Sequence, residues 1–255
     1  MGAHPLSRFR RWLTPLAVLG LACRGAPLQA QLVIEPGDAA FWVGATTLVA
    51  GAAAFDGAIS SSAARNPPTS LDRLANALQP LGLERYDAPI LAGTWVVARV
   101  VGSGPGNAVL RIAAGYVTAD LLESALKFAV GRHRPDTTGG GPWRFRPFSA
   151  HNEWQSFPSA HTTHVFVIAA GIAEEVHNPV VRVVAYGTAV LVGWQRIESR
   201  AHWPSDVAAS AALAVAASET TNRWLGRVMS GGASSPARVR VLASPTGIVI
   251  SAAIP

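Results

Sequence analysis

The sequence contains little cysteine, little charge and almost no lysine, and the first two scarcities exclude whole classes of protein. A single cysteine, Cys23, in 255 residues excludes an intramolecular disulfide framework and a cysteine-based zinc site. Because 49% of the residues are hydrophobic and only 14% are charged, most of the chain is expected to fold around a core. Lysine occurs once, as Lys127, whereas the chain has twenty arginines. The residues that follow Lys127 are therefore of particular interest.

The N-terminal segment has the order of a secretory signal. Three arginines between residues 8 and 11 precede an apolar run at 12–22, and small residues follow as far as Ala30. We therefore expect residues 1–30 to be a signal peptide that exports the protein to the cell envelope, on its periplasmic face. A lipid anchor at Cys23 and an uncleaved anchor helix are the alternatives.

The first 30 residues also carry much of the positive charge. They contain four arginines and no acidic residue, so the formal net charge falls from +6 for the whole chain to +2 for residues 31–255. No block of basic residues remains after the signal, so the sequence argues against nucleic acid as a partner.

Apolar runs separated by turn signals predict an all-α fold, a single bundle of about six core helices. A further short helix is expected from Ser70, capped by the serine hydroxyl. The abundance of alanine and glycine in the last four core helices predicts that their backbones approach closely. The core helices are expected at residues 39–55, 88–101, 107–130, 161–176, 180–195 and 204–227.

The composition changes at the end of the bundle, which we assign to residues 31–229. Residues 230–236 form a Gly/Ser-rich linker, and two short strands at 238–242 and 247–251 predict a small C-terminal β-hairpin. The chain is thus divided into a signal peptide at 1–30, the helical bundle, and a linker with a hairpin tail at 230–255.

The apolar helices suit either a soluble bundle or shallow embedding in a membrane. A membrane span needs about 20 mostly apolar residues, whereas apart from 39–55 these runs are shorter or interrupted by charges. The long loop at 136–157, between the third and fourth core helices, mixes aromatic residues with arginines. Such a mixture suits a membrane interface, although it can also simply pack a loop. Its members are Trp143, Arg144, Phe145, Arg146, Phe148 and Trp154.

Four places carry residues able to act on a phosphate, and the first is the end of the third core helix. Here Lys127 is followed by Arg134 and Pro135. Each cation also has an ordinary structural interpretation. Lys127 lies four residues after Glu123, the spacing of an ion pair on a helix surface, and Arg134 is also consistent with a solvated loop.

The second place is the helix start at Pro158-Ser159-Ala160-His161. Ser159 is suited to the N-cap position, and the free backbone N–H groups and dipole of a helix start favour an anion such as phosphate. A histidine in this first turn can donate a proton to such an anion. His164 follows His161 at a spacing found in zinc sites, but no third ligand accompanies the pair, so we expect no metal.

The third and fourth places are Arg196 and the pair His202 and Asp206. Pro204 predicts that a helix starts between the two paired residues. The Asp206 carboxylate could then accept a hydrogen bond from one ring nitrogen of His202 and leave the other nitrogen free to attack. The alternative is a helix-capping aspartate beside a packed histidine.

Together these motifs resemble the type 2 phosphatidic acid phosphatase superfamily, which includes bacterial acid phosphatases and vanadium haloperoxidases. The family signatures are Lys-x6-Arg-Pro, Pro-Ser-Gly-His and Ser-Arg-x5-His-x3-Asp. They correspond here to Lys127 through Pro135, Pro158 through His161, and Gln195 through Asp206. The resemblance covers roughly residues 107–217.

The resemblance implies a role for each residue of the motifs. His202 would be the nucleophile and Asp206 the residue that orients it, while His161 would be the general acid. The substrate phosphate would be bound by Lys127, Arg134, Ser159, the Ala160 amide and Arg196. Because these fixed cations supply the positive charge, we expect neither a metal nor another cofactor.

The sequence departs from the family pattern at two positions and offers one misleading match. Ala160 replaces a glycine, so its methyl group could crowd the phosphate, and Gln195 replaces a serine. Ser199-Arg200 looks like the serine–arginine pair, but only one residue separates Arg200 from His202. The required spacing of five residues selects Arg196.

The sequence therefore predicts an envelope phosphatase that acts on a phosphomonoester or diphosphate, on a lipid carrier, through a phosphohistidine. The expected partners are this phosphorylated substrate and a membrane surface. The alternatives are a vanadate-dependent haloperoxidase, whose pocket would hold vanadate in place of phosphate, and a catalytically silent helical envelope protein.

Overall fold

The computed structural model describes residues 38–65, 69–137, 141–229, 238–244 and 247–253. The predicted signal peptide, the alternative anchor at Cys23 and the predicted linker at 230–236 lie outside these ranges.

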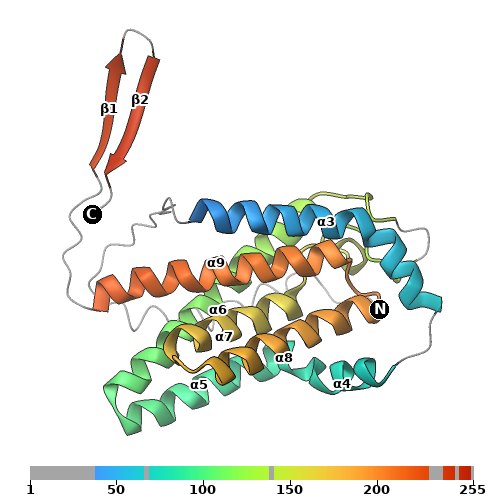
Figure 1. The fold of residues 1–255 in the computed structure, drawn as a ribbon, viewed down its shortest axis with the longest axis horizontal. Coiled ribbons are helices and arrows are strands. Elements are labelled where there is room, and N and C mark those ends of the chain that lie inside the picture. Colours follow the sequence, from blue (N-terminus) through green and yellow to red (C-terminus); the bar gives the residue numbers. More distant parts are fainter. Residues whose placement is uncertain (1–37, 66–68, 138–140, 230–237, 245–246, 254–255) are drawn as a thin grey trace.

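Seven α-helices make up the described part of the bundle, which confirms the all-α prediction (Figure 1). The six predicted core helices are all present, and the seventh is the short helix expected near Ser70. The helices are α3 (Asp38–Arg65), α4 (Ser70–Leu78), α5 (Glu84–Val101), α6 (Ser103–Val130), α7 (Ala160–Glu175), α8 (Pro179–Glu198) and α9 (Pro204–Met229). Two 3₁₀ helices, η2 (Gln79–Gly82) and η3 (Asn152–Trp154), complete them.

Local capping explains several helix boundaries and corrects one prediction. The N-cap of α4 is Thr69 and not Ser70, because Thr69 and Asp72 form a reciprocal capping box. Helix α6 ends at Gly131, whose φ of 58° and ψ of 52° are left-handed. A Cβ atom there would lie 1.8 Å from the carbonyl oxygen of Arg146, so only glycine fits where the chain turns into the long loop.

Helix α7 lies at the centre of the bundle and packs against α6, α8 and α9. Small residues bring these helices close together, as predicted. A Cβ on Gly171 of α7 would lie 2.8 Å from the Ile112 side chain of α6, and one on Gly193 of α8 would lie 2.9 Å from Val207 of α9. One core cluster is formed by Tyr116, Ala119, Val167, Ala214 and Ala217.

The outer helices expose apolar faces. Among the described residues, one helix, at Ala39–Arg65, is long and apolar enough to cross a membrane by length and composition, and almost none of its apolar stretch is buried. Valines of α5 and α8 are also exposed, with Val100 at 85% and Val183 at 71%. Helix α3 lies alongside α9 (Figure 1), so it presents one side to the bundle and the other outward.

The predicted C-terminal hairpin is also present. Strands β1 (Arg238–Ser244) and β2 (Gly247–Ala253) pair antiparallel, with Arg238 opposite Ala253 and Ser244 opposite Gly247. Each strand is two residues longer than the sequence pattern indicated.

Candidate active site

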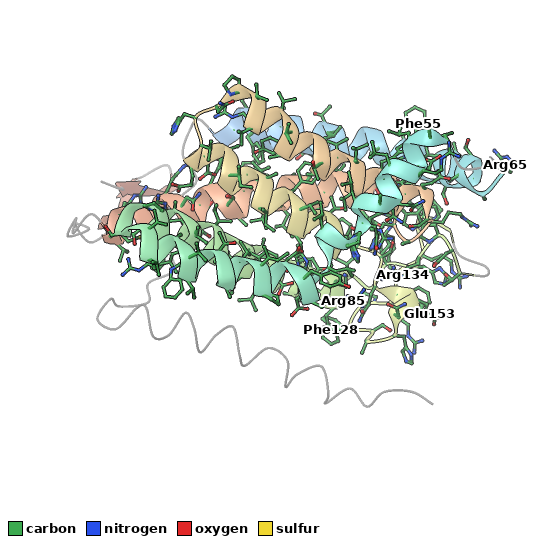
Figure 2. All side chains as sticks on the ribbon, turned by 90° about the horizontal axis from the view of Figure 1, so that it is seen from below. Phe55, Arg65, Arg85, Phe128, Arg134 and Glu153 are labelled. Carbon is green, nitrogen blue, oxygen red and sulfur yellow. The ribbon has the colours of Figure 1, made fainter. Side chains whose placement is uncertain are left out.

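The residues singled out in the sequence lie at helix ends and in the loops that join them. Lys127 is in the last turn of α6. Arg134 follows after the helix end at Gly131, in the segment that leads into the long loop (Figure 2). Ser159 and His161 begin α7, and Arg196 is in the last turn of α8. His202 lies in the loop before α9, and Asp206 is in the first turn of α9.

Hydrogen bonds join these separate loops into one structure. The Arg134 guanidinium donates through Nη1 to the carbonyl of Ala201 at 3.2 Å, and through Nε to the carbonyl of Asn152 at 2.9 Å. The backbone N–H of His202 donates to the carbonyl of Arg196 at 3.1 Å. The chain segment that carries His202 is therefore held by both motif arginines.

His202 is buried, and its ring orientation is set by a backbone carbonyl. Its Nδ1 lies 2.5 Å from the carbonyl oxygen of Ser156. Since a carbonyl can only accept, Nδ1 must carry the proton in this contact, and Nε2 of the neutral ring keeps its lone pair. This is the tautomer that a nucleophilic histidine needs.

From the sequence we expected Asp206 to accept this hydrogen bond, and that prediction is wrong. Both Asp206 oxygens have other partners: Oδ1 accepts from Arg132 at 2.6 Å, and Oδ2 accepts from the Ser156 hydroxyl at 2.5 Å and the Trp203 amide at 2.9 Å. Asp206 thus reaches the His202 ring through Ser156 and not directly. Its bond to the Trp203 amide, just before α9, agrees with the alternative view of a capping aspartate.

Burial and nearby cations keep His202 neutral. Desolvation lowers its pKa well below the usual 6.5, and the charges of Arg134 and Lys127 lower it further. The hydrogen bond to the Ser156 carbonyl acts in the opposite direction, and the charge of Arg196 adds a smaller lowering effect. Three cations from three chain segments therefore lie close enough to act on one imidazole.

His161, in the first turn of α7, has a similar electrostatic environment. Burial and then the charges of Arg196, His164, Lys127 and Arg134 lower its pKa to about 3. Its Nε2 lies 3.2 Å from the Gln79 amide nitrogen of η2, so the amide N–H donates to a ring nitrogen that carries no proton. Gln79 was not predicted, because nothing in its local sequence marks it.

The cations differ in how many protein partners they have. Arg196 donates to the Ser199 hydroxyl at 3.3 Å, while its buried Nε has no hydrogen-bond partner among the described residues. A buried guanidinium N–H without a partner is what an anion site requires before the anion arrives. Lys127 forms the expected ion pair with Glu123, but both side chains are largely buried, so the pair does not lie on the helix surface. The pair also fixes the direction of the Lys127 side chain.

The start of α7 is built as predicted around Ser159. Its hydroxyl accepts from the Thr162 amide at 3.4 Å and from the Thr162 hydroxyl at 3.0 Å. Its backbone N–H donates to Ser210 of α9 at 2.7 Å. Ser159 therefore caps the helix as an acceptor, and its own O–H, with the amides of Ala160 and His161, can donate to an anion.

The structure also explains three positions that the sequence left open. Gln195, where the family has serine, donates to Asn76 at 2.9 Å and so ties α8 to α4. Arg200 donates to the carbonyl of Pro135 at 2.6 Å, which gives it a structural contact with the loop after Arg134. His164 pairs with Asp120 at 2.8 Å and lies 3.2 Å from the Tyr116 hydroxyl.

Besides Gln79, two functional candidates were missed in the sequence, Arg132 and Ser156. Arg132 is buried and bonds Asp206, while Ser156 supplies both a carbonyl to His202 and a hydroxyl to Asp206. Arg132 lies inside the first motif, two residues before Arg134, so its position offered a signal. Ser156 offered none, because a serine in a loop is unremarkable.

The arrangement has the features that binding a phosphate and attacking it would require. Cations from the ends of α6 and α8 and from the long loop surround two neutral imidazoles, beside the amides of a helix start. Such an arrangement can stabilise the charge on transferring phosphoryl oxygens, and the unprotonated Nε2 of His202 has the lone pair that a nucleophile needs.

Comparison with known proteins agrees with this chemistry. Residues 108–230 match the sequence profile of the PAP2 superfamily. Over 98 residues, the chain is 41% identical to the lipid A 1-phosphatases of Rhizobium johnstonii and Rhizobium etli. The match covers 38% of this chain and 39% and 41% of those proteins, so the matched region spans about two fifths of the length of these curated relatives.

Two solved structures have the same fold. One is the transmembrane PAP2-type phosphatidylglycerolphosphate phosphatase of Bacillus subtilis, with a TM-score of 0.57 and 20% identity over 74% of this chain and 96% of that one. The other is LpxE of Aquifex aeolicus, with a TM-score of 0.51 and 19% identity over 64% of this chain and 92% of that one. At this identity the structures show a common fold, while the motifs and the profile define the family. Residues 108–230, which contain all three motifs, belong to the PAP2 superfamily.

Proposed function

We propose that this protein is a phosphatase that removes a phosphate group from a lipid in the cell envelope through a phosphohistidine intermediate. The observation that carries the proposal is the state of His202. It is a buried, neutral imidazole whose Nδ1 is held by the Ser156 carbonyl and whose Nε2 is unprotonated among three cations.

In the first step, Nε2 of His202 attacks the phosphorus, a P–N bond forms, and the P–O bond to the lipid breaks. His161 donates a proton to the leaving oxygen. In the second step, His161 takes a proton from water, whose oxygen attacks the phosphorus and releases inorganic phosphate from His202. Arg196, Arg134 and Lys127 neutralise the phosphoryl oxygens throughout.

The proposed role of His161 requires its pKa to rise when substrate binds. Without an anion, burial and the surrounding positive charges hold this pKa at about 3. A phosphate dianion beside the ring offsets two of the surrounding positive charges and so favours the imidazolium. The substrate would thereby create the acid that its own cleavage needs.

Three observations support a lipid substrate. The outward faces of α3, α5 and α8 are apolar, and α3 meets the length and hydropathy of a membrane span. The long loop exposes Trp143 and Phe148, at 67% and 70%. The curated relatives are lipid A 1-phosphatases, so lipid A is the first substrate to test. A protein exported by residues 1–30 and associated with a membrane would meet such lipids.

The test uses the purified full chain in detergent micelles and in lipid vesicles. Phosphate release would be measured with lipid A, phosphatidic acid, phosphatidylglycerol phosphate, an isoprenoid diphosphate and a soluble aryl phosphate. We expect turnover with at least one lipid phosphate, faster than with the aryl phosphate, and none in the His202→Ala variant. Release from no lipid, or equal release by that variant, would contradict the proposal.

A further inference from the structure

Helix α3 carries a charge in the middle of an apolar sequence. Asp56 is the only charged residue between Asp38 and Arg65, and its side chain is completely buried. A charged residue within an otherwise apolar helix is costly unless it is paired, and in a candidate membrane span it suggests a functional role.

The partners of Asp56 lie at the edge of the candidate active site. Its Oδ2 accepts from Arg132 Nη2 at 2.7 Å and from the Ser205 hydroxyl at 2.6 Å. Its Oδ1 accepts from the Ser205 amide at 2.9 Å. Asp56 therefore caps the start of α9 from a different helix, close to the loop that carries His202.

Arg132 extends this contact to Asp206. Its Nη1 donates to Asp206 at 2.6 Å and to Ser205 at 2.7 Å, and its Nε and Nη2 donate to the carbonyl of Pro142. The guanidinium thus lies between two fully buried carboxylates, one on α3 and one on α9. Planar pairing of a guanidinium with carboxylates restricts the relative position of the partners.

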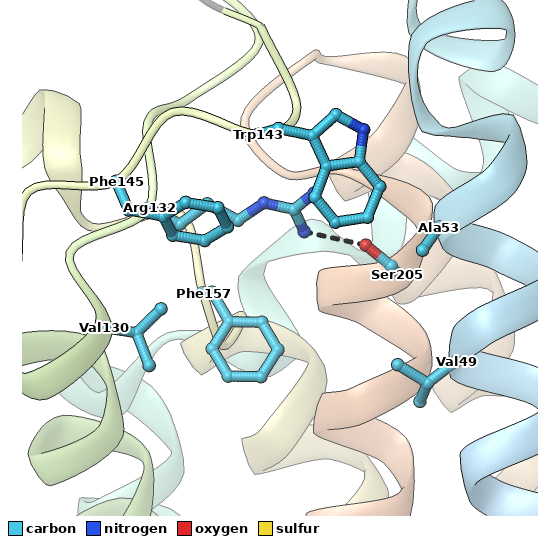
Figure 3. Close-up of a pocket in the computed structure, with 8 residues that line it drawn as sticks. All are labelled: Val49, Ala53, Val130, Arg132, Trp143, Phe145, Phe157 and Ser205. Atoms are coloured by element: carbon cyan, nitrogen blue, oxygen red, sulfur yellow. Dashed lines mark hydrogen bonds between the residues drawn. The ribbon is translucent and has the colours of Figure 1, made fainter.

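The surroundings of Arg132 are apolar, which strengthens these ion pairs. A cavity of about 300 Å³ between α3 and the long loop is lined by Val49, Ala53, Val130, Trp143, Phe145 and Phe157, with Arg132 and Ser205 (Figure 3). Figure 3 shows the hydrogen bond from Arg132 to Ser205 inside this apolar lining. Charges interact more strongly where little water screens them.

The last two contacts reach the imidazole. Asp206 accepts from the Ser156 hydroxyl, and the carbonyl of the same serine accepts from Nδ1 of His202, each at 2.5 Å. We propose that Asp56 is a positioning residue that holds His202 in its reactive orientation and tautomer. The connection runs from α3 through Arg132, Asp206 and Ser156, and the proposal rests on the proposed function, in which His202 is the nucleophile.

The test compares Asp56→Asn and Ser156→Ala with a control, Glu175→Gln. Glu175, at the end of α7 opposite to His161, pairs with Arg111 of α6, so the control removes a comparable carboxylate charge outside the connection. We expect each test variant to lower kcat by about 10- to 100-fold, the usual effect of disturbing groups that orient a reacting side chain, with KM changed by no more than about twofold. The control should retain wild-type kcat.

Two further measurements separate positioning from general damage. The Asp56→Asn, Ser156→Ala double variant should lose little more kcat than the more impaired single variant, because both changes interrupt one connection. In ¹⁵N-histidine-labelled protein in micelles, the hydrogen-bonded Nδ1 proton of His202 should be visible in the wild type and the control, and shifted or lost in both test variants.

The His202 resonance also distinguishes failure of the proposed function from failure of the positioning role of Asp56. If the wild type hydrolyses no lipid phosphate, the proposed function fails, while the His202 resonance still decides the role of Asp56. Unchanged kcat and an unchanged resonance in Asp56→Asn would overturn the positioning role. If that variant does not fold, Ser156→Ala, which leaves both ion pairs in place, decides instead: an unchanged resonance there would also overturn it.

Discussion

Arg196 and Arg200 lie four residues apart, and the structure predicts opposite consequences of replacing each with glutamine. Arg196 is assigned to the phosphate, whereas Arg200 donates to the Pro135 carbonyl at 2.6 Å. Arg196→Gln should therefore lower activity and leave stability intact. Arg200→Gln should lower stability and leave activity nearly intact.

The magnitudes follow from the contacts of each guanidinium. Losing one donor to the developing charge of a transition state costs about 2.7–4 kcal/mol, or roughly 100- to 1,000-fold in kcat. The protein itself loses little at Arg196, because its bond to the exposed Ser199 hydroxyl is long, at 3.3 Å, and its charge lies near that of Arg134. Losing the charge-assisted hydrogen bond of Arg200 should lower the unfolding free energy by about 1.5–3 kcal/mol. Each kcal/mol lost should lower Tm by roughly 2–4 °C.

The assay measures initial phosphate release and Tm for both variants in the same micelles, with Arg196→Lys as a third. Lysine keeps the charge but not the planar fork, so its activity should fall between those of wild type and Arg196→Gln. Greater loss of activity in Arg200→Gln than in Arg196→Gln would refute the alignment of the third motif and the anion site built on it.

Three further predictions use the two histidines. His202→Ala should release no phosphate and form no acid-labile phosphoenzyme on rapid quenching with ³²P-labelled substrate, whereas His161→Ala should still form some; labelling of the first variant would exclude His202 as the nucleophile. Since the pKa values of both histidines lie below 6.5, the unfolded state binds more protons as pH falls from about 6.5, so unfolding free energy should fall by up to about 1.4 kcal/mol per pH unit for each. Tm measured against pH checks this sign, and a shallower slope is expected when inorganic phosphate is bound. Gly82→Ala would place a Cβ 2.9 Å from His161 atoms and should lower kcat at least about tenfold. The control is Gly93→Ala, whose Cβ would meet no described atom within 4 Å and should leave kcat unchanged. Equal activity of the two variants would show that the packing of Gly82 on His161 is unimportant.

Much of the fold could be predicted because helix boundaries have local causes. Gly131 ends α6 since its left-handed backbone requires glycine, and Pro204 begins α9 where a missing N–H costs nothing. The first helix was predicted too short because the prediction also used only local signals. The uncharged run ends before Asp56, but α3 continues to Arg65. The charge is accepted because Arg132, which is 76 residues away, neutralises it.

The candidate site was predicted in its members but not in its hydrogen bonds. Motif spacing identified Lys127, Arg134, His161, Arg196 and His202, and the structure brings these residues into one electrostatic environment. The same reasoning assigned Asp206 directly to His202, because the two are four residues apart and chemically complementary. The structure inserts Ser156 between them, from a loop 50 residues before Asp206 in the chain.

The helices, the superfamily and the identity of the charged groups could be established before any coordinates, because periodicity, caps and motif spacing act over a few residues. Long-range packing was needed to show which atom accepts the His202 proton, which described cations act on the two histidines, and that α3 contacts the start of α9. These contacts form only when segments far apart in the chain are positioned to within about 1 Å, because a hydrogen bond tolerates only a narrow range of distances. Sequence patterns do not encode positions at that precision.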